Sequence, residues 1–172
     1  MSIKLIAADL DGTLLTSKRR FPPGLFSLIG QLRQRGVRFA PASGRQYYNL
    51  WELFAPISEE LVYISENGAM VCDGAEILSF DAMPQDEVVR VVQTARELAG
   101  VSAILACRDG GFYENKTDGV FLENMAFFYA RRRYTPDLLA IARNEPVCKV
   151  ALFCSRHAED REIGRASCRE RV

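Results

Sequence analysis

The sequence has 172 residues but only one histidine and one tryptophan, and it lacks any excess of charge: Lys and Arg number 22, as do Asp and Glu. A zero net charge gives no reason to expect a nucleic-acid or membrane-surface partner. No apolar run approaches the roughly 18 to 20 residues of a membrane-spanning helix, and the chain becomes acidic at Asp9, too early for a signal peptide. We therefore expect a cytoplasmic protein with no nucleic-acid or membrane partner.

Paired cysteines are also missing. The five cysteines are scattered, odd in number and never spaced C-x-x-C: Cys72, Cys107, Cys148, Cys154 and Cys168. That pattern argues against a disulfide framework and against a zinc site, and it fits reduced thiols in a cytoplasm. The single histidine, His157, is expected in a surface loop without a role.

Apolar runs alternate with helical patterns in the first half of the chain. We expect strands at 3–8, 37–43 and 61–65, with helices at 22–36 and 45–54 between them. Pro41 is expected near the end of its strand, because a central strand needs its N–H groups. This order of elements predicts an α/β fold with a parallel sheet whose strand ends meet at one edge.

Beyond residue 65 the pattern changes. Asn67-Gly68 and Asp73-Gly74 are turn pairs and predict hairpin structure. Pro84 begins a further helix, followed by a strand at 102–107, an irregular stretch, an aromatic-rich helix near 119–131 and a strand at 147–153. We therefore divide the chain into a core, 1–82, and a second α/β unit, 83–161.

The last eleven residues, 162–172, show neither a helical nor a strand period. Residues 163–171 read IGRASCRER, which matches a translated reading frame of a common sequencing adapter. The segment is therefore interpreted as non-native and is left out of the fold prediction.

The strongest chemical signal is the run Asp9-Leu10-Asp11-Gly12-Thr13 directly after the first strand. Alternation along an extended chain turns Asp9 and Asp11 to the same side. Such a pair suits phosphate-ester hydrolysis, in which one carboxylate attacks phosphorus and the other protonates the leaving oxygen. Gly12 permits a sharp turn, and Thr13 offers a hydroxyl and an N–H group. An Asp-rich turn capping a helix, or the D-x-D metal pair of a glycosyltransferase, is the alternative.

A second signal, Ser43-Gly44-Arg45, follows the second strand. A hydroxyl, a glycine N–H and a following helix start can hold an anion, although a serine helix cap needs no function. A third signal, Asn67, lies after the third strand, where an ordinary Asn-Gly turn is the alternative. The carboxyl ends of parallel strands meet at one edge, so these residues are expected near Asp9.

Together, IAADLDGTLL, SGRQYYNL and ENGA resemble the haloacid dehalogenase superfamily, in particular its Cof-type sugar phosphatases with a class IIB cap. The resemblance implies a Rossmann-like parallel core, here its N-terminal part, and a partial α/β cap that selects the substrate. It implies that Asp9 is the nucleophile and Asp11 the general acid–base, and that Mg²⁺ is bound by the Asp9 carboxylate and the Asp11 backbone carbonyl. The resemblance assigns phosphate binding and substrate contact to the remaining motif residues: phosphate to Gly12, Thr13, Ser43 and Gly44, and substrate to Arg45 and Asn67.

Two further motifs of that superfamily are absent from the sequence: a lysine that pairs with the nucleophile and an acidic GDxxND-like cluster that completes the metal site. After Ser43 the only lysines are Lys116 and Lys149, and Lys149 is interpreted as part of a cap strand. The 172 residues alone are therefore expected to be inactive and poorly soluble.

The expected function of the parent protein is Mg²⁺-dependent hydrolysis of small phosphorylated metabolites, such as sugar phosphates. A phosphomutase of the same superfamily and a non-catalytic fragment are the alternatives.

Overall fold

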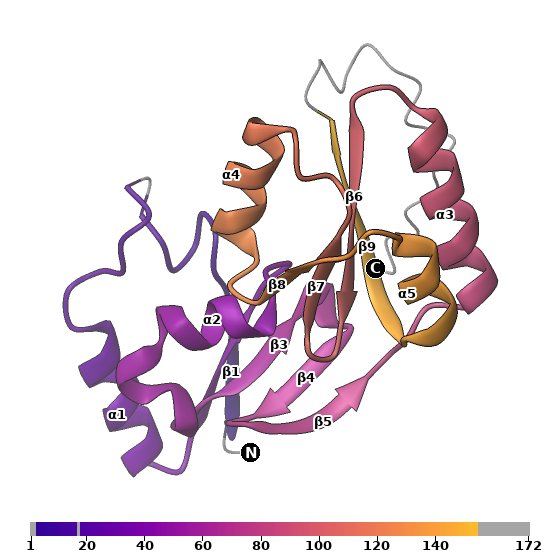
Figure 1. Ribbon diagram of the computed structural model, residues 1–172. Helices are drawn as coiled ribbons and strands as arrows, with labels where there is room; N and C mark the ends of the chain where they lie inside the picture. Colours follow the sequence, from indigo (N-terminus) through magenta and orange to yellow (C-terminus); the bar gives the residue numbers. More distant parts are fainter. Residues whose placement is uncertain (1–2, 17, 155–172) are drawn as a thin grey trace. The chain divides into compact units, whose positions relative to one another are not determined.

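In the computed structural model, residues 3–16 and 18–154 are described, and they form two compact units that divide between Asp81 and Ala82. Each unit consists of a β-sheet with its own helices and its own apolar core (Figure 1). The segment 162–172, interpreted from the sequence as non-native, lies outside the described residues. His157 and Cys168 lie outside them as well.

The first unit contains a five-stranded sheet in the order β1-β2-β3-β4-β5. The first three strands run parallel and the last two form an antiparallel hairpin, as expected. Its strands and helices are β1 (Leu5–Asp9), α1 (Leu25–Gln34), β2 (Arg38–Ala42), α2 (Tyr47–Leu53), β3 (Val62–Ser65), β4 (Met70–Asp73) and β5 (Glu76–Phe80), with short 3₁₀ turns η1 (Ala55–Glu60) and η2 (Glu66–Gly68) on either side of β3.

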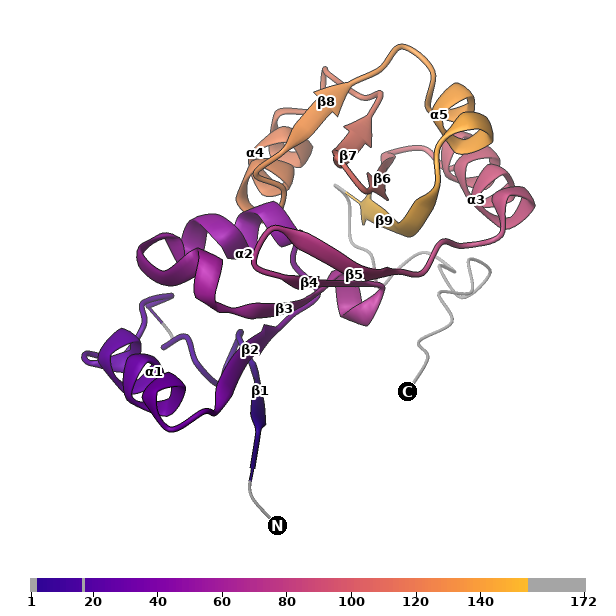
Figure 2. The same ribbon diagram turned by 90° about the horizontal axis from the view of Figure 1, so that it is seen from below.

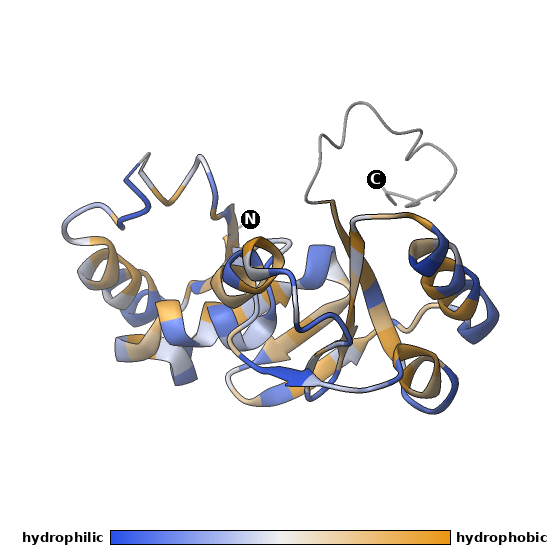
Figure 3. Ribbon diagram, turned by 45° about the horizontal axis from the view of Figure 1, so that its top comes forward, coloured by the Kyte–Doolittle hydropathy of each residue, from blue (hydrophilic) through white to orange (hydrophobic). Residues whose placement is uncertain are grey.

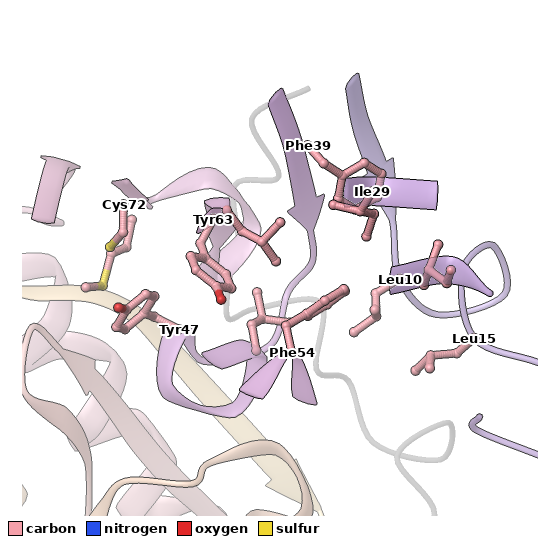
Figure 4. Packing of buried hydrophobic residues seen from close by; sticks show 12 residues of the cluster. Leu10, Leu15, Ile29, Phe39, Tyr47, Phe54, Tyr63 and Cys72 are labelled. Carbon is pink, nitrogen blue, oxygen red and sulfur yellow. The ribbon is translucent and has the colours of Figure 1, made fainter. Parts of the chain in front are cut away.

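Both helices of this unit cover the same face of the sheet (Figure 2). Phe54 and Tyr63 are fully buried there, and burial of a phenylalanine side chain contributes about 1.5–3 kcal/mol. The ring of Tyr47 from α2 meets the ring of Tyr63 edge-on at 5.3 Å (Figure 4). Leu5 lies on β1 at the sheet edge and is 48% exposed.

The strand register sets the level of the functional residues. Asp9 at the end of β1 lies opposite Ala42 at the end of β2, and Ala42 lies opposite Ile64 of β3. Pro41 lies opposite Ala8, one residue before β2 ends, which agrees with the expectation that it lies near the end of its strand. The residues that follow these strands therefore emerge at one edge of the sheet.

The second unit contains a four-stranded sheet in the order β8-β7-β6-β9. Its elements are α3 (Gln85–Glu97), β6 (Val101–Cys107), β7 (Gly110–Tyr113), α4 (Gly119–Phe128), β8 (Arg132–Tyr134), α5 (Leu138–Asn144) and β9 (Val147–Cys154). Helices α3 and α5 pack on one face of the sheet, with the hydrophilic side of α3 turned away from it (Figure 3). On the other face, Phe121 of α4 meets Phe153 of β9 at 5.8 Å.

Three elements of this unit were missing from the sequence prediction. The stretch expected to be irregular contains β7, which begins with two glycines and so shows no apolar alternation. The aromatic helix ends at Phe128, and the three-residue β8 that follows is charged and exposed. The short helix α5 begins after Asp137, whose carboxylate accepts the N–H of Leu139 at 3.0 Å.

Candidate active site

The chain turns sharply where β1 ends. Gly12 has a φ of 83°, in the left-handed region that favours glycine. The N–H of Leu14 donates to the Leu10 carbonyl at 3.1 Å and to the Asp9 carbonyl at 3.3 Å, which closes the turn. Leu10 is fully buried, whereas Asp9 and Asp11 on either side of it are exposed. The expected alternation is therefore present, and both carboxylates are open to solvent.

Thr13 contacts the expected nucleophile. Its hydroxyl donates to Oδ2 of Asp9 at 3.4 Å, near the long limit for a hydrogen bond. The contact leaves the second carboxylate oxygen, Oδ1, outside this bond. Thr13 thus lies beside Asp9, and its assignment to the phosphate stays a prediction.

Asp11 lies beside a cation that its sequence neighbours do not reveal. Arg45 donates from Nε to Oδ2 of Asp11 at 2.9 Å and from a terminal nitrogen to Oδ1 at 2.7 Å. These hydrogen bonds from Arg45 hold the pKa of the Asp11 carboxyl below its usual value. Paired carboxylates require such a cation to stay ionised together, and the guanidinium supplies one for Asp11.

The Ser43-Gly44-Arg45 loop follows β2 directly. The Ser43 N–H donates to the Ile64 carbonyl at 2.9 Å, and the Ser43 hydroxyl accepts the Arg45 N–H at 3.2 Å. Helix α2 starts only at Tyr47, with Gln46 at its N-cap. Ser43 is therefore not the cap of α2, so the capping alternative does not explain this serine.

The turn between β3 and β4 is hydrogen-bonded to this loop. The Asn67 N–H donates to the Ser43 carbonyl at 3.2 Å, and the Glu66 N–H donates to the Arg45 carbonyl at 3.0 Å. Both residues have positive φ angles, 51° for Glu66 and 61° for Asn67. Asn67 was expected near the site from its sequence position, whereas Glu66, which is 3% exposed, was not.

Oxygen donors at this edge suit a hard cation such as Mg²⁺: the exposed Asp9 carboxylate and the Asp11 backbone carbonyl are of the kind it prefers. Among residues 3–16 and 18–154, however, no group of three or more His, Cys, Asp or Glu side chains is arranged to hold a metal. These two donors can supply part of a metal site, and the remaining ligands would have to come from elsewhere.

In the same described part of the chain, none of the helices combines the length and the apolar character needed to span a bilayer.

A search of curated proteins finds phosphatases. The chain is 31% identical over 136 residues to the 5-amino-6-(5-phospho-D-ribitylamino)uracil phosphatase YbjI of Escherichia coli, covering 78% of this chain and 50% of that protein. It is 25% identical over 122 residues to the pyridoxal phosphate phosphatase YbhA of Escherichia coli, covering 70% and 44%. The chain thus spans about half the length of these relatives.

Solved structures share the fold. SMU.1108c from Streptococcus mutans matches with a TM-score of 0.74 and 25% identity, covering 88% of this chain and 57% of that one. The class IIB sugar phosphatase BT4131 matches with a TM-score of 0.68 and 23% identity, covering 87% and 58%.

The model of the haloacid dehalogenase-like hydrolases matches residues 6–171, nearly the whole chain. The Asp9–Asp11 turn and the Ser43 loop lie within this span, at the ends of two adjacent parallel strands. This chain belongs to the haloacid dehalogenase-like hydrolases.

Proposed function

We propose that the protein is a Mg²⁺-dependent phosphatase of small phosphorylated metabolites, with Asp9 as nucleophile. The observation that carries the proposal is the register of β1 and β2. Because Asp9 lies opposite Ala42, the loop that begins at Ser43 starts level with the attacking carboxylate. The N–H groups and the hydroxyl of this loop are suited to donate hydrogen bonds to the phosphoryl oxygens. Positioning and neutralising those oxygens governs phosphoryl transfer.

The chemistry would run in two displacements. A carboxylate oxygen of Asp9 attacks phosphorus, an O–P bond to Asp9 forms, and the ester P–O bond breaks. The leaving oxygen takes a proton from Asp11, which has to carry one when the substrate is bound although Arg45 favours its ionised form. Water then gives a proton to Asp11 and attacks the aspartyl phosphate, which releases inorganic phosphate and restores Asp9.

The remaining roles would fall to backbone and side-chain groups near Asp9. Gly12, Thr13, Ser43 and Gly44 are proposed to contact the phosphate, and the Asp9 carboxylate and the Asp11 carbonyl to bind Mg²⁺. The ion, when bound, would neutralise phosphate charge. The family lysine and acidic cluster, which the 172 residues lack, would complete the site from other parts of the complete gene product.

The substrate proposal extends the names of the relatives. Those proteins are named for a phosphoribityl compound and for pyridoxal phosphate. Both are small phosphate monoesters, so we include sugar phosphates and flavin-type precursors among the candidate substrates. The second unit, 83–161, is proposed as the cap that selects among them.

The test is phosphate release by the complete gene product with Mg²⁺, compared between the parent and the nearly isosteric Asp9→Asn. We expect the substitution to abolish turnover, and mass spectrometry to find the trapped phosphoryl group on Asp9 in the parent. Asp86→Asn is the matched control, because Asp86 is 82% exposed on α3. Full turnover by Asp9→Asn would disprove the assignment. A phosphorylated isomer in place of free phosphate would identify the protein as a mutase. Complete inactivity of the parent would show that the chain is not catalytic.

A further inference from the structure

Both oxygens of the Asp11 carboxylate are held by one guanidinium. Arg45 bonds Oδ2 through Nε at 2.9 Å and Oδ1 through a terminal nitrogen at 2.7 Å. Two parallel charge-assisted bonds fix the orientation of a carboxylate as well as its position. The Asp11 side chain is 53% exposed, so solvent on its other sides offers no comparable restraint.

Arg45 itself is fixed from several directions. Its side chain is 5% exposed, and its other terminal nitrogen donates to Oδ1 of Asn49 at 3.2 Å. Its backbone N–H is bonded to the Ser43 hydroxyl and its carbonyl to the Glu66 N–H. The guanidinium is therefore a rigid donor anchored in the sheet edge, while Asp11 projects from a turn.

We propose that Arg45 is a positioning residue that acts through Asp11 and does not bind the phosphate. The proposal rests on the proposed phosphatase function. In the first displacement the leaving oxygen takes its proton from Asp11, and in the second Asp11 takes a proton from water. When Asp11 carries the proton, its protonated oxygen can face the reacting oxygen while its other oxygen still accepts from Arg45, which keeps the carboxyl in place.

A double-mutant cycle in the complete gene product tests whether Arg45 acts through Asp11. We expect Arg45→Ala to lower kcat by a large part of the roughly 10²–10⁴-fold that general acid–base catalysis contributes, with little change in KM. In an Asp11→Asn background the same substitution should have no further effect on kcat. Additive losses, or a rise in KM as the main effect, would overturn the proposal and favour a direct substrate contact.

Matched variants separate positioning from general damage. Arg38 lies in the same sheet and makes a similar two-bond contact with Asp73 at the opposite end of β2. Arg38→Ala should leave kcat unchanged in either background. Arg45→Lys keeps the charge but cannot form the planar fork. Compared with Arg45→Ala, it should therefore be more stably folded but have an equally low kcat. Full activity of Arg45→Lys would contradict the proposal.

A structural measurement keeps the proposal testable without turnover. Crystal structures of the parent and of Arg45→Lys should show one Asp11 orientation in the parent and a displaced or multiple orientation in the variant. An unchanged Asp11 in the variant would refute the positioning role, whether or not the protein is active. An inactive parent in which Asp11 still moves on substitution would refute the phosphatase proposal alone.

Discussion

The side chain of Asn67 occupies the space that a side chain at Gly44 would need. A Cβ built on Gly44 would lie 2.6 Å from Oδ1 of Asn67, closer than any unstrained contact. The β3–β4 turn and the loop after β2 are thus fitted to each other through the absence of a side chain. This contact adds to the two backbone bonds that Asn67 and Glu66 make to the same loop.

Gly44→Ala should therefore destabilise the complete gene product. Overpacking costs about 1–3 kcal/mol, and we expect the lower end, about 1 kcal/mol, because the obstructing atom ends a side chain that can rotate. Urea unfolding measures the change. Gly30→Ala is the control, because its Cβ would meet nothing within 4 Å in helix α1, where alanine is favoured by about 0.5–1 kcal/mol.

A second substitution should restore the lost stability. Combining Gly44→Ala with Asn67→Gly removes the clash, because the obstructing side chain is gone. Glycine also adopts the φ of 61° at position 67 without strain. We expect the double variant to be more stable than Gly44→Ala. A double variant that is less stable would show that Asn67 matters for another reason.

Acid should weaken the first unit through its two arginine–aspartate pairs. Hydrogen bonds from Arg45 and Arg38 hold the pKa values of Asp11 and Asp73 below their usual value, which is about 3.9. The stability that these carboxylates contribute is therefore fully present above that value and is lost as the pH falls through the lowered folded pKa. Asp73→Asn and Arg38→Ala should each flatten the decline in unfolding free energy between about pH 5 and pH 2. A decline as steep as that of the parent would contradict this.

The stability of the second unit should depend on Arg96. Arg96 bonds Glu114 at 2.9 and 2.6 Å and Asp137 at 2.7 Å, which ties α3 to the end of β7 and the start of α5. We expect Arg96→Ala to cost about 1 kcal/mol for the Glu114 bonds alone, since the pair is only partly shielded from water. Arg90→Ala, which removes an exposed contact of 4.0 Å, should be neutral. Equal melting temperatures for the two variants would show that the Arg96 cluster adds no stability.

Thiol reactivity should follow burial. Burial raises the pKa of Cys72 to about 11 and that of Cys107 to about 12. At pH 8 nearly all of both thiols are protonated and therefore unreactive. Mass spectrometry after iodoacetamide treatment should find Cys154, which is partly exposed, labelled before either. Labelling of Cys72 or Cys107 at the rate of Cys154 would mean that the fold opens readily.

Some features of this protein follow from neighbouring residues alone. The turn at Gly12, the outward alternation of Asp9 and Asp11, and the start of α1 after Pro22-Pro23 depend on backbone geometry over a few residues. Such patterns are present in the sequence and predict the parallel strands and the Asp9 edge. Strand β8 has no such pattern, because an exposed edge strand with two successive arginines shows no apolar alternation.

The pairing of Arg45 with Asp11 was decided only by the tertiary structure. These residues are 34 positions apart. The sequence alone suggested that Arg45 contacts the substrate, and that role stays a prediction. The contact between Gly44 and Asn67 likewise depends on how the loops after β2 and β3 meet. Side chains distant in sequence meet only where strand register and packing bring them level, and the local pattern around each residue carries no information about that register.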